Sequence, residues 1–486
     1  MTPPRVLLIN PTITSHARFP LAVMHLAAAL SERYATRIID GNVDGDYIET
    51  TRAALRAGDV VAIGISVMGG PQLPSALAVS RAIREEAPQL PIIWGGYFPT
   101  LCPDATLASP VVDYAVRGQG ERTIRELLDA LAAGCELQDI AGLSWRRQGE
   151  TVHNHDRGFS PVAPALDFDS VDEPQRYIGP TYLGRRTTGY QAALGCRYRC
   201  SFCGVAALFR GKTALPPAER VEQDLLELRA RFGVDSVQFY DHNFFDREVD
   251  MQPLLHTLAR VAMPWWCYAR ADALLGLSDA SWALVRKSRL RMAYIGAESP
   301  DDATLKSMRK GTRSDQTLEV VEACRRNGVV PELSFMLAPP HDPVGETERT
   351  FEFIRRIKRV HPAAEIMLHI NTPLPPQRGM RPDPNAPRLD FPTTAEGWAE
   401  PQWVRYWCHK DAPWVDAPLR RRIEDFRLVL GSRFPTITDW RAPGWQKQAL
   451  RGVAAWRYRL RRYDRPWELA LLRQVVRLWD PQLKGL

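Results

Sequence analysis

The sequence predicts an α/β protein with three parts: an N-terminal doubly wound, Rossmann-like parallel sheet, a partial (β/α)6 barrel similar to a TIM barrel, and a mainly α-helical C-terminal region. Three observations support this prediction. Strand patterns alternate with helical patterns over residues 1–135, the alternation returns over residues 188–373, and it stops at a Pro-rich segment, residues 375–394. The expected domains are residues 1–150, a linker at 151–183, the barrel at 184–380 and a capping or substrate region at 381–486.

In the first part, short apolar runs are separated by segments with apolar residues at helical spacing. Strands that alternate with helices of this length form βαβ units, which assemble into a parallel sheet with helices on both faces. The predicted strands are residues 5–10, 36–40, 60–66, 91–96 and 113–118, and the predicted helices are residues 21–34, 72–87 and 121–134.

The second part contains six further βα units. Six strands are fewer than the eight of a closed barrel, so we expect a curled sheet that stays open along one side. The predicted strands are residues 188–195, 236–241, 265–271, 292–299, 331–337 and 365–373, with helices such as 218–233 and 317–328 between them.

The composition is that of a folded globular protein. Of 486 residues, 45% are hydrophobic and 24% charged, and no apolar run approaches the ~20 residues that a membrane-spanning helix requires. The N-terminal apolar run is shorter than that of a secretory signal, and five of the eight cysteines are scattered singly, unlike a disulfide framework. We therefore expect a cytoplasmic protein.

The stretch LGCRYRCSFCG places Cys196, Cys200 and Cys203 on one loop, just after the first predicted barrel strand. A structural zinc site takes four ligands, usually as two pairs, and no second Cys/His pair lies at a suitable spacing. A four-iron cluster held by three thiolates instead leaves one iron open for a substrate. The carboxyl end of a barrel strand is also where such folds place their chemistry.

The C-x3-C-x2-C spacing, with Phe202 before the last cysteine, resembles the radical S-adenosylmethionine (SAM) superfamily. The resemblance implies a [4Fe–4S] cluster on the three cysteines, whose open iron binds SAM and splits it to a 5′-deoxyadenosyl radical. It also implies that Phe202 lies beside the adenine, that Arg270 holds the SAM carboxylate and that Glu298 holds the ribose hydroxyls. The segment LAPPHDPVGET, residues 337–347, departs from the family pattern.

Two glycine-bearing loops follow predicted strands of the N-terminal sheet, where open α/β sheets bind ligands. Ser66-Val67-Met68 followed by Gly95-Gly96 resembles the Ser-x-Leu and Gly-Gly signature of cobalamin-binding domains, and VRGQGERT resembles their fifth-strand loop. No Asp-x-His-x-x-Gly element occurs, so the resemblance implies cobalamin bound without a histidine lower ligand; the alternative is a degenerate domain that binds nothing. The predicted cofactor contacts are Ser66, Met68, Gly69, Gly95, Gly96, Tyr97, Gly118 and Glu121.

The C-terminal region carries the net charge of +7, since residues 391–486 hold 18 Lys and Arg against 10 Asp and Glu. Nine of the fourteen tryptophans lie beyond residue 378. This pattern predicts a helical cap that closes over the open barrel and helps to shape the substrate pocket. The alternatives are peripheral contact with an anionic membrane surface and nucleic-acid binding, which lacks a recognition module here.

Together the resemblances imply a cobalamin-dependent radical SAM enzyme, specifically a methyltransferase that moves a methyl group from methylcobalamin to an unactivated carbon. The alternatives are a radical cyclase or rearrangement enzyme similar to the tetrapyrrole ring cyclases, and a non-catalytic cobalamin- or cluster-binding protein. The implied partners are a small-molecule substrate of the natural-product, lipid or tetrapyrrole class and an external electron donor such as flavodoxin or ferredoxin. The sequence identifies neither the substrate nor a catalytic acid or base.

Overall fold

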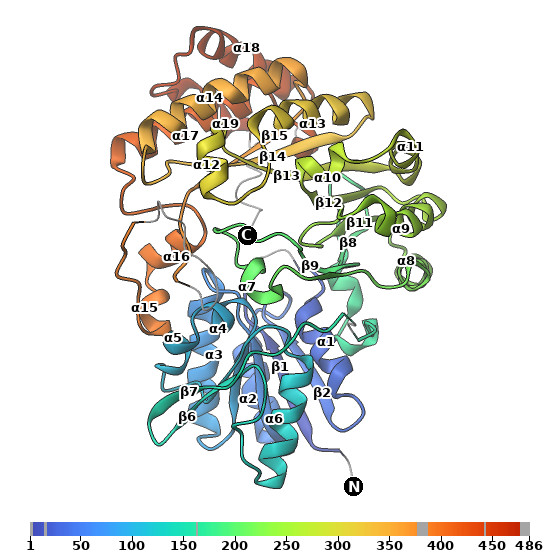
Figure 1. Ribbon diagram of the computed structural model, residues 1–486, viewed down its shortest axis with the longest axis vertical. Helices are drawn as coiled ribbons and strands as arrows, with labels where there is room; N and C mark the ends of the chain where they lie inside the picture. The colour runs from blue at the N-terminus through green and yellow to red at the C-terminus, as the bar shows by residue number, and fades with distance from the viewer. Residues whose placement is uncertain (1–2, 14–16, 162–163, 377–386, 442–443, 477–486) are drawn as a thin grey trace.

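The computed structural model describes residues 3–13, 17–161, 164–376, 387–441 and 444–476 (Figure 1). Its N-terminal part is a seven-stranded sheet with the strand order β2-β1-β3-β4-β5-β6-β7. The five predicted strands are confirmed and pair in parallel. They are β1 (Arg5–Asn10), β2 (Ala35–Asp40), β3 (Val60–Ser66), β4 (Ile92–Gly95) and β5 (Tyr114–Val116).

Helices cover both faces of this sheet. α1 contacts α6, and α2 contacts α3. The helices are α1 (Leu21–Leu30), α2 (Tyr47–Arg56), α3 (Gln72–Glu86), α4 (Tyr97–Leu101), α5 (Pro103–Leu107) and α6 (Glu121–Ala133). An antiparallel hairpin, β6 (Leu143–Arg147) and β7 (Glu150–His153), adds to the β5 edge. The sheet therefore continues to His153, a few residues beyond position 150.

The segment after the hairpin holds two short 3-10 turns, η1 (Phe168–Ser170) and η2 (Pro174–Tyr177). Phe19, at the start of α1, packs against Phe168 and stacks on Tyr177, with ring centroids 5.3 and 5.0 Å apart. The linker thus lies against the first loop of the N-terminal sheet, which fixes where the second sheet begins.

The second sheet has six parallel strands in the order β15-β14-β13-β12-β11-β8, which confirms the partial barrel. The strands are β8 (Thr187–Tyr190), β11 (Ser236–Phe239), β12 (Trp265–Ala269), β13 (Leu290–Glu298), β14 (Val330–Leu337) and β15 (Glu365–Ile370). The helices between them are α8 (Ala218–Phe232), α9 (Glu248–Val261), α10 (Ala271–Leu275), α11 (Asp279–Ser288), α12 (Asp302–Ser307), α13 (Ser314–Arg326) and α14 (Pro343–Val360).

The inner face of this sheet carries an aromatic and polar row. Neighbouring strands pair Tyr268 with Tyr294, Tyr294 with Glu332, and Glu332 with Glu365, so these four side chains share one face. The Trp266 indole donates to the Glu332 carboxylate at 3.0 Å. Apolar side chains such as Leu333 alternate with this row along the strands and belong to the main hydrophobic core.

The C-terminal region divides into two groups of helices. α15 (Ala395–Trp398) and α16 (Pro401–Trp407) lie beside the N-terminal sheet, where α15 contacts α3. α17 (Ala417–Arg433) packs on α14, where Phe426 stacks on Phe351 at 3.7 Å. α18 (Gly444–Leu460) and α19 (Trp467–Val476) pack on α17. Of the helices in the described ranges, none is long and apolar enough to cross a bilayer.

Candidate cofactor site between the two sheets

The cysteine loop follows β8 and the short strand β9 (Leu194–Gly195). Gly195 has a φ of +78°, and a Cβ there would lie 2.3 Å from the Lys212 carbonyl, so only glycine fits this turn. The buried Asp241 carboxylate, at the end of β11, accepts the N–H groups of Ala192 and Ala193 at 3.0 and 2.5 Å. The loop is therefore fixed to the carboxyl ends of β8 and β11.

Two further contacts hold the loop itself. Arg197 forms an ion pair with Asp246 at 2.7 Å, and the Ser201 N–H donates to the Met308 carbonyl at 2.9 Å. The helix α7 (Val205–Phe209) follows directly and contacts α4 of the N-terminal sheet. The loop thus bridges the barrel and the N-terminal sheet.

The three thiols lie close enough to influence one another's ionisation. Burial, together with the neighbouring Cys200, raises the pKa of Cys203 to about 12. Burial also raises the pKa of Cys196, whereas the positive charge of Arg270 acts to lower it. Thiolates at these positions therefore need a metal charge beside them.

Within the described ranges, no three His, Cys, Asp or Glu side chains converge closely enough to hold a single metal ion. An iron–sulfur cube does not require that convergence, because each thiolate binds a different iron atom. Three neighbouring thiols with the Arg270 guanidinium beside Cys200 are a donor set that suits such a cluster, and the assignment of Cys196, Cys200 and Cys203 as its ligands stays a prediction.

Arg270, at the end of β12, is buried beside the cysteine loop. Its guanidinium makes two bonds to the Asp272 carboxylate, at 2.9 and 3.0 Å, and lies 3.6 Å above the Tyr198 ring. Nη1 donates to the Cys200 Sγ at 3.7 Å. Arg270 thus brings positive charge to the thiols from the barrel side, and its role toward the SAM carboxylate stays a prediction.

Glu298 ends β13 in a left-handed conformation, with φ +62°, at an irregularity in the pairing with β14. Such conformations in non-glycine residues are concentrated at functional sites. Its carboxylate accepts a hydrogen bond from the Lys310 ammonium at 2.7 Å, and both side chains are buried. A Cβ at Gly296 would lie 2.1 Å from the Glu298 Oε1, so Gly296 leaves the space that this pair occupies.

Lys310 is not among the site residues that the sequence predicts. Its ammonium lies 5.8 Å from the Phe202 ring centroid, and its backbone carbonyl accepts a bond from Arg270 at 2.5 Å. Lys310 therefore connects the three residues predicted to hold SAM, namely Phe202, Arg270 and Glu298. In the sequence, Lys310 lies in the MRKG segment after the fourth-strand motif. A lysine in such a segment is ordinarily expected to be exposed at the surface, so the sequence did not indicate a buried ion pair.

The segment that departs from the family pattern, residues 337–347, is anchored by Glu346. This fully buried carboxylate accepts from Ser299 at 2.5 Å and from Thr304 at 2.7 Å. Since Ser299 follows Glu298 directly, Glu346 holds the turn in which Glu298 lies.

The N-terminal loops predicted to bind cobalamin are joined to each other. The Val67 N–H donates to the Gly95 carbonyl at 2.8 Å, and the Phe98 N–H donates to the Val67 carbonyl at 2.9 Å. Gly96 has a φ of +96°, and a Cβ there would approach Val67 backbone atoms at 3.2 Å. A Cβ on Gly95 would meet only Val116, at an ordinary 3.7 Å. Gly96 is therefore required by the loop itself, whereas Gly95 is not.

A flat ring already lies on the glycine turn that follows β3. A Cβ on Gly69 would come within 2.5 Å of the Trp407 indole of α16, and Gly70 faces the same side chain. The Met68 side chain is exposed, and Ser66 lies beside Gly96. The turn at Gly69 fits a flat group, and in this structure the Trp407 indole occupies that position. Space for an added side chain remains instead beside Gly95, on the neighbouring loop.

Tyr97 joins the N-terminal loops to the cysteine loop. A Cβ on Gly204 would lie 2.2 Å from the Tyr97 hydroxyl oxygen, so the hydroxyl packs directly on the backbone that follows Cys203. Gly118 approaches the Leu208 carbonyl of α7 in the same region. Glu121 opens α6, and burial raises its pKa. The predicted cobalamin loops and the predicted cluster loop therefore face each other across this contact.

The barrel interior beyond these loops contributes residues that no sequence motif predicts. The exposed Arg18 guanidinium, from the first loop of the N-terminal sheet, lies 4.8 Å from the Tyr240 ring centroid. The Tyr294 hydroxyl and the His369 Nε2 are 3.2 Å apart, and burial lowers the pKa of both His369 and His409 to about 4. No motif indicated these positions, because only the barrel curvature brings them together.

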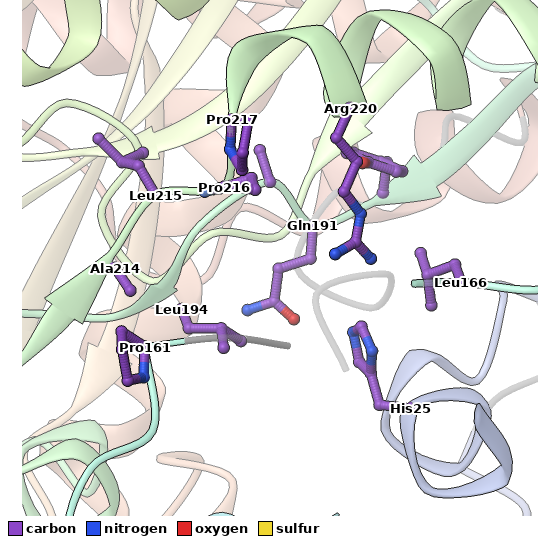
Figure 2. A pocket seen from close by; sticks show the side chains of 12 residues that line it. His25, Pro161, Leu166, Gln191, Leu194, Ala214, Leu215, Pro216, Pro217 and Arg220 are labelled. Carbon is purple, nitrogen blue, oxygen red and sulfur yellow. The ribbon is translucent and has the colours of Figure 1, made fainter. Parts of the chain in front are cut away.

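A separate cavity of about 300 Å³ lies between α1, the linker and the start of α8. Figure 2 shows His25, Gln191 and Arg220 pointing toward this space. The predicted cofactor residues are not among those that line it. Gln191 leads into the cysteine loop, so the cavity lies behind that loop and not between the two cofactor loops.

Comparison with protein-family models matches residues 16–128 to the B12 binding domain and residues 190–354 to the radical SAM superfamily. An uncharacterized methyltransferase of Pyrococcus horikoshii is 24% identical over 350 residues, which cover 70% of this chain and 73% of that protein. An anaerobic magnesium-protoporphyrin IX monomethyl ester cyclase of Synechocystis is 25% identical over 264 residues, 53% of this chain and 52% of that protein.

Among solved structures, the radical SAM methyltransferase TsrM of Kitasatospora setae, with tryptophan substrate and a SAM analogue bound, superposes with a TM-score of 0.63. It is 19% identical and the match covers 75% of this chain and 73% of TsrM. At this identity the likeness establishes the shared fold, and both the domain order and the barrel agree with the sequence prediction.

We predict that replacing Cys196, Cys200 and Cys203 together by Ala abolishes the broad visible absorption of the anaerobically reconstituted protein, because all three thiolates hold the cluster. Iron and sulfide analysis gives the stoichiometry. The control is Cys135→Ala, which removes an exposed thiol and should leave the spectrum unchanged. A full cluster in the triple variant would contradict the assignment.

We predict that Gly95→Val prevents cobalamin binding and leaves the iron content unchanged, because the added side chain fills space beside the loop without straining it. Cobalamin retained after gel filtration is the measurement. Gly45→Val is the matched control, since a Cβ at Gly45 has no neighbour within 4 Å. Equal retention by wild type and Gly95→Val would place cobalamin elsewhere.

We predict that Lys310→Met weakens SAM binding to the reconstituted protein at least about tenfold, because it leaves Glu298 buried without its partner, a change that costs about 3–5 kcal/mol in comparable pairs. Titration calorimetry measures the affinity, and iron content shows whether the loop has kept its structure. Lys310→Arg keeps the charge and should restore part of the affinity. Unchanged affinity in Lys310→Met would remove Lys310 from the site.

Proposed function

We propose that this chain, which joins a B12 binding domain to a radical SAM domain and so belongs to the cobalamin-dependent radical SAM enzymes, methylates an unactivated carbon of a small-molecule substrate. The observation that carries the proposal is the contact of Tyr97 with Gly204. It brings the loop predicted to hold cobalamin against the loop predicted to hold the cluster. A methyl donor and a radical generator placed this close can act on one substrate.

When bound, the cluster and SAM supply the 5′-deoxyadenosyl radical, and cobalamin supplies the methyl group. The chain's own residues bind and orient. In the proposal Arg270 and Glu298 hold SAM, Lys310 fixes the position of Glu298, and Phe202 lies beside the adenine. The buried Glu298–Lys310 pair is oriented before SAM arrives, so little reorganisation accompanies binding.

The substrate would lie on the inner face of the barrel, between Tyr240, Tyr268 and Tyr294. These rings exclude water, which protects a radical intermediate from unwanted hydrogen donors. Arg18 is exposed beside Tyr240 and forms no ion pair with any described residue. This arrangement favours a substrate that carries a flat system and an anionic group.

The proposed reaction also needs an electron-donor protein and a reducing compartment. An external electron donor such as flavodoxin or ferredoxin would reduce the cluster, because each reductive cleavage of SAM consumes one electron. The cysteines are all unpaired thiols in the structure, which suits a reducing cytoplasm.

We predict that the reconstituted protein, given cobalamin, reductant and SAM labelled in its methyl group, transfers the label to its bound cobalamin without any added substrate. Mass spectrometry of the extracted cobalamin measures this transfer. A cyclase or rearrangement enzyme would form 5′-deoxyadenosine and leave the cobalamin unlabelled, which would overturn the methyltransferase assignment. The absence of both products would favour a non-catalytic binding protein.

A further inference from the structure

The large apolar side chains that remain exposed are concentrated near the C-terminal end of the described chain. Trp445 on α18 is 67% exposed and Trp467 on α19 is 72% exposed. Burying such rings would lower the free energy of the protein, so a group of them indicates an interaction surface. Six of them lie within residues 440–471: Trp440, Trp445, Trp456, Leu460, Trp467 and Leu471.

The spacing on α18 shows that these side chains are not remnants of the core. Trp445, Trp456 and Leu460 are separated by eleven and four residues, which places them on one side of the helix. Leu450 and Ala454 occupy the opposite side and are fully buried. α18 therefore has one apolar side against the helical bundle and a second one toward solvent.

Positive charge accompanies the exposed apolar side. Residues 440–472 contain eight Lys and Arg and only two acidic residues. Both acidic residues are already paired, Glu468 with Arg457 and Asp464 with Arg422. Arg459 and Arg462 are exposed and make no ion pair with any residue in the described ranges. The segment of α18 and α19 therefore exposes both apolar and cationic side chains.

We infer that α18 and α19 bind the surface of an anionic lipid bilayer. The Trp–Arg face is defined here as Trp440, Trp445, Trp456, Leu460, Trp467 and Leu471 together with Arg441, Arg459 and Arg462. Tryptophan rings partition to the headgroup region, and arginine pairs with anionic headgroups while its stem covers apolar surface. The helices lie on the membrane and do not span it.

The position of this face separates the inference from the proposed function. In Figure 1, α18 lies at one end of the long axis and the N-terminal sheet at the other. The loops of the cofactor site lie between these two ends, so membrane contact through α18 would not place them against the lipid. The interaction therefore locates the protein at the membrane, whatever reaction it catalyses.

The test uses the full-length protein and co-sedimentation with phosphatidylcholine vesicles, with and without phosphatidylserine. Binding should require phosphatidylserine and weaken as salt is raised. The double variants Trp445→Ala/Trp456→Ala and Arg459→Glu/Arg462→Glu should each lower the vesicle affinity about tenfold or more. Leu226→Ala and Val249→Ala, which truncate exposed apolar residues on α8 and α9, should bind as wild type does.

Three outcomes would overturn the inference. The wild type could fail to bind the anionic vesicles, or the two double variants could bind these vesicles as tightly as the wild type does. The protein could also self-associate in solution through the same tryptophans. The last outcome, measured by analytical ultracentrifugation of wild type and the tryptophan double variant, would assign the face to a second copy of the chain. A folded double variant is recognised by unchanged iron content after reconstitution.

Discussion

The buried ion pair between Glu298 and Lys310 is the interaction on which the barrel side of the cofactor site depends. A buried carboxylate and a buried ammonium are each unfavourable alone, and each is tolerated here because the other is 2.7 Å away. Lys310 lies in the turn after α12, so the pair ties that turn to the end of β13. The same turn supplies the carbonyl that holds Arg270, and Arg270 in turn contacts Cys200. One ion pair therefore connects two strand ends with the cysteine loop.

The second constraint is that two sheets must present their loops to each other. The loops that follow the parallel strands of each sheet lie against those of the other sheet. Tyr97 of the N-terminal sheet packs on Gly204 of the cysteine loop. Trp398 and Trp407 of α15 and α16 pack against Phe98, in the helix that Tyr97 begins. Phe98 is fully buried as a result. Aromatic packing from the C-terminal region thus supports the same loop.

The C-terminal region therefore does two separate things. Near its start, the Trp414 indole donates to the Ala338 carbonyl and Ile370 donates to the His409 carbonyl, so this part reaches the carboxyl ends of β14 and β15. Further along, α17 packs on α14 through Phe426 and carries the Trp–Arg face outward on α18 and α19. The expected cap over the barrel is consistent with the first part, whereas the charge that motivated the membrane alternative belongs to the second.

The sequence by itself determined the two parallel sheets and the position of the cysteine loop, because local apolar periodicity and short spacings carry that information. Phe202, Arg270 and Glu298 were also identified from motifs that lie close to strand ends. Only the tertiary structure revealed Lys310, Arg18 and the Trp407 contact with Gly69. Lys310 is twelve residues from Glu298, and Trp407 is hundreds of residues from Gly69, so no local pattern reports these pairs. Their proximity follows from the curvature of the barrel and from the docking of α16, which depend on packing across the whole chain.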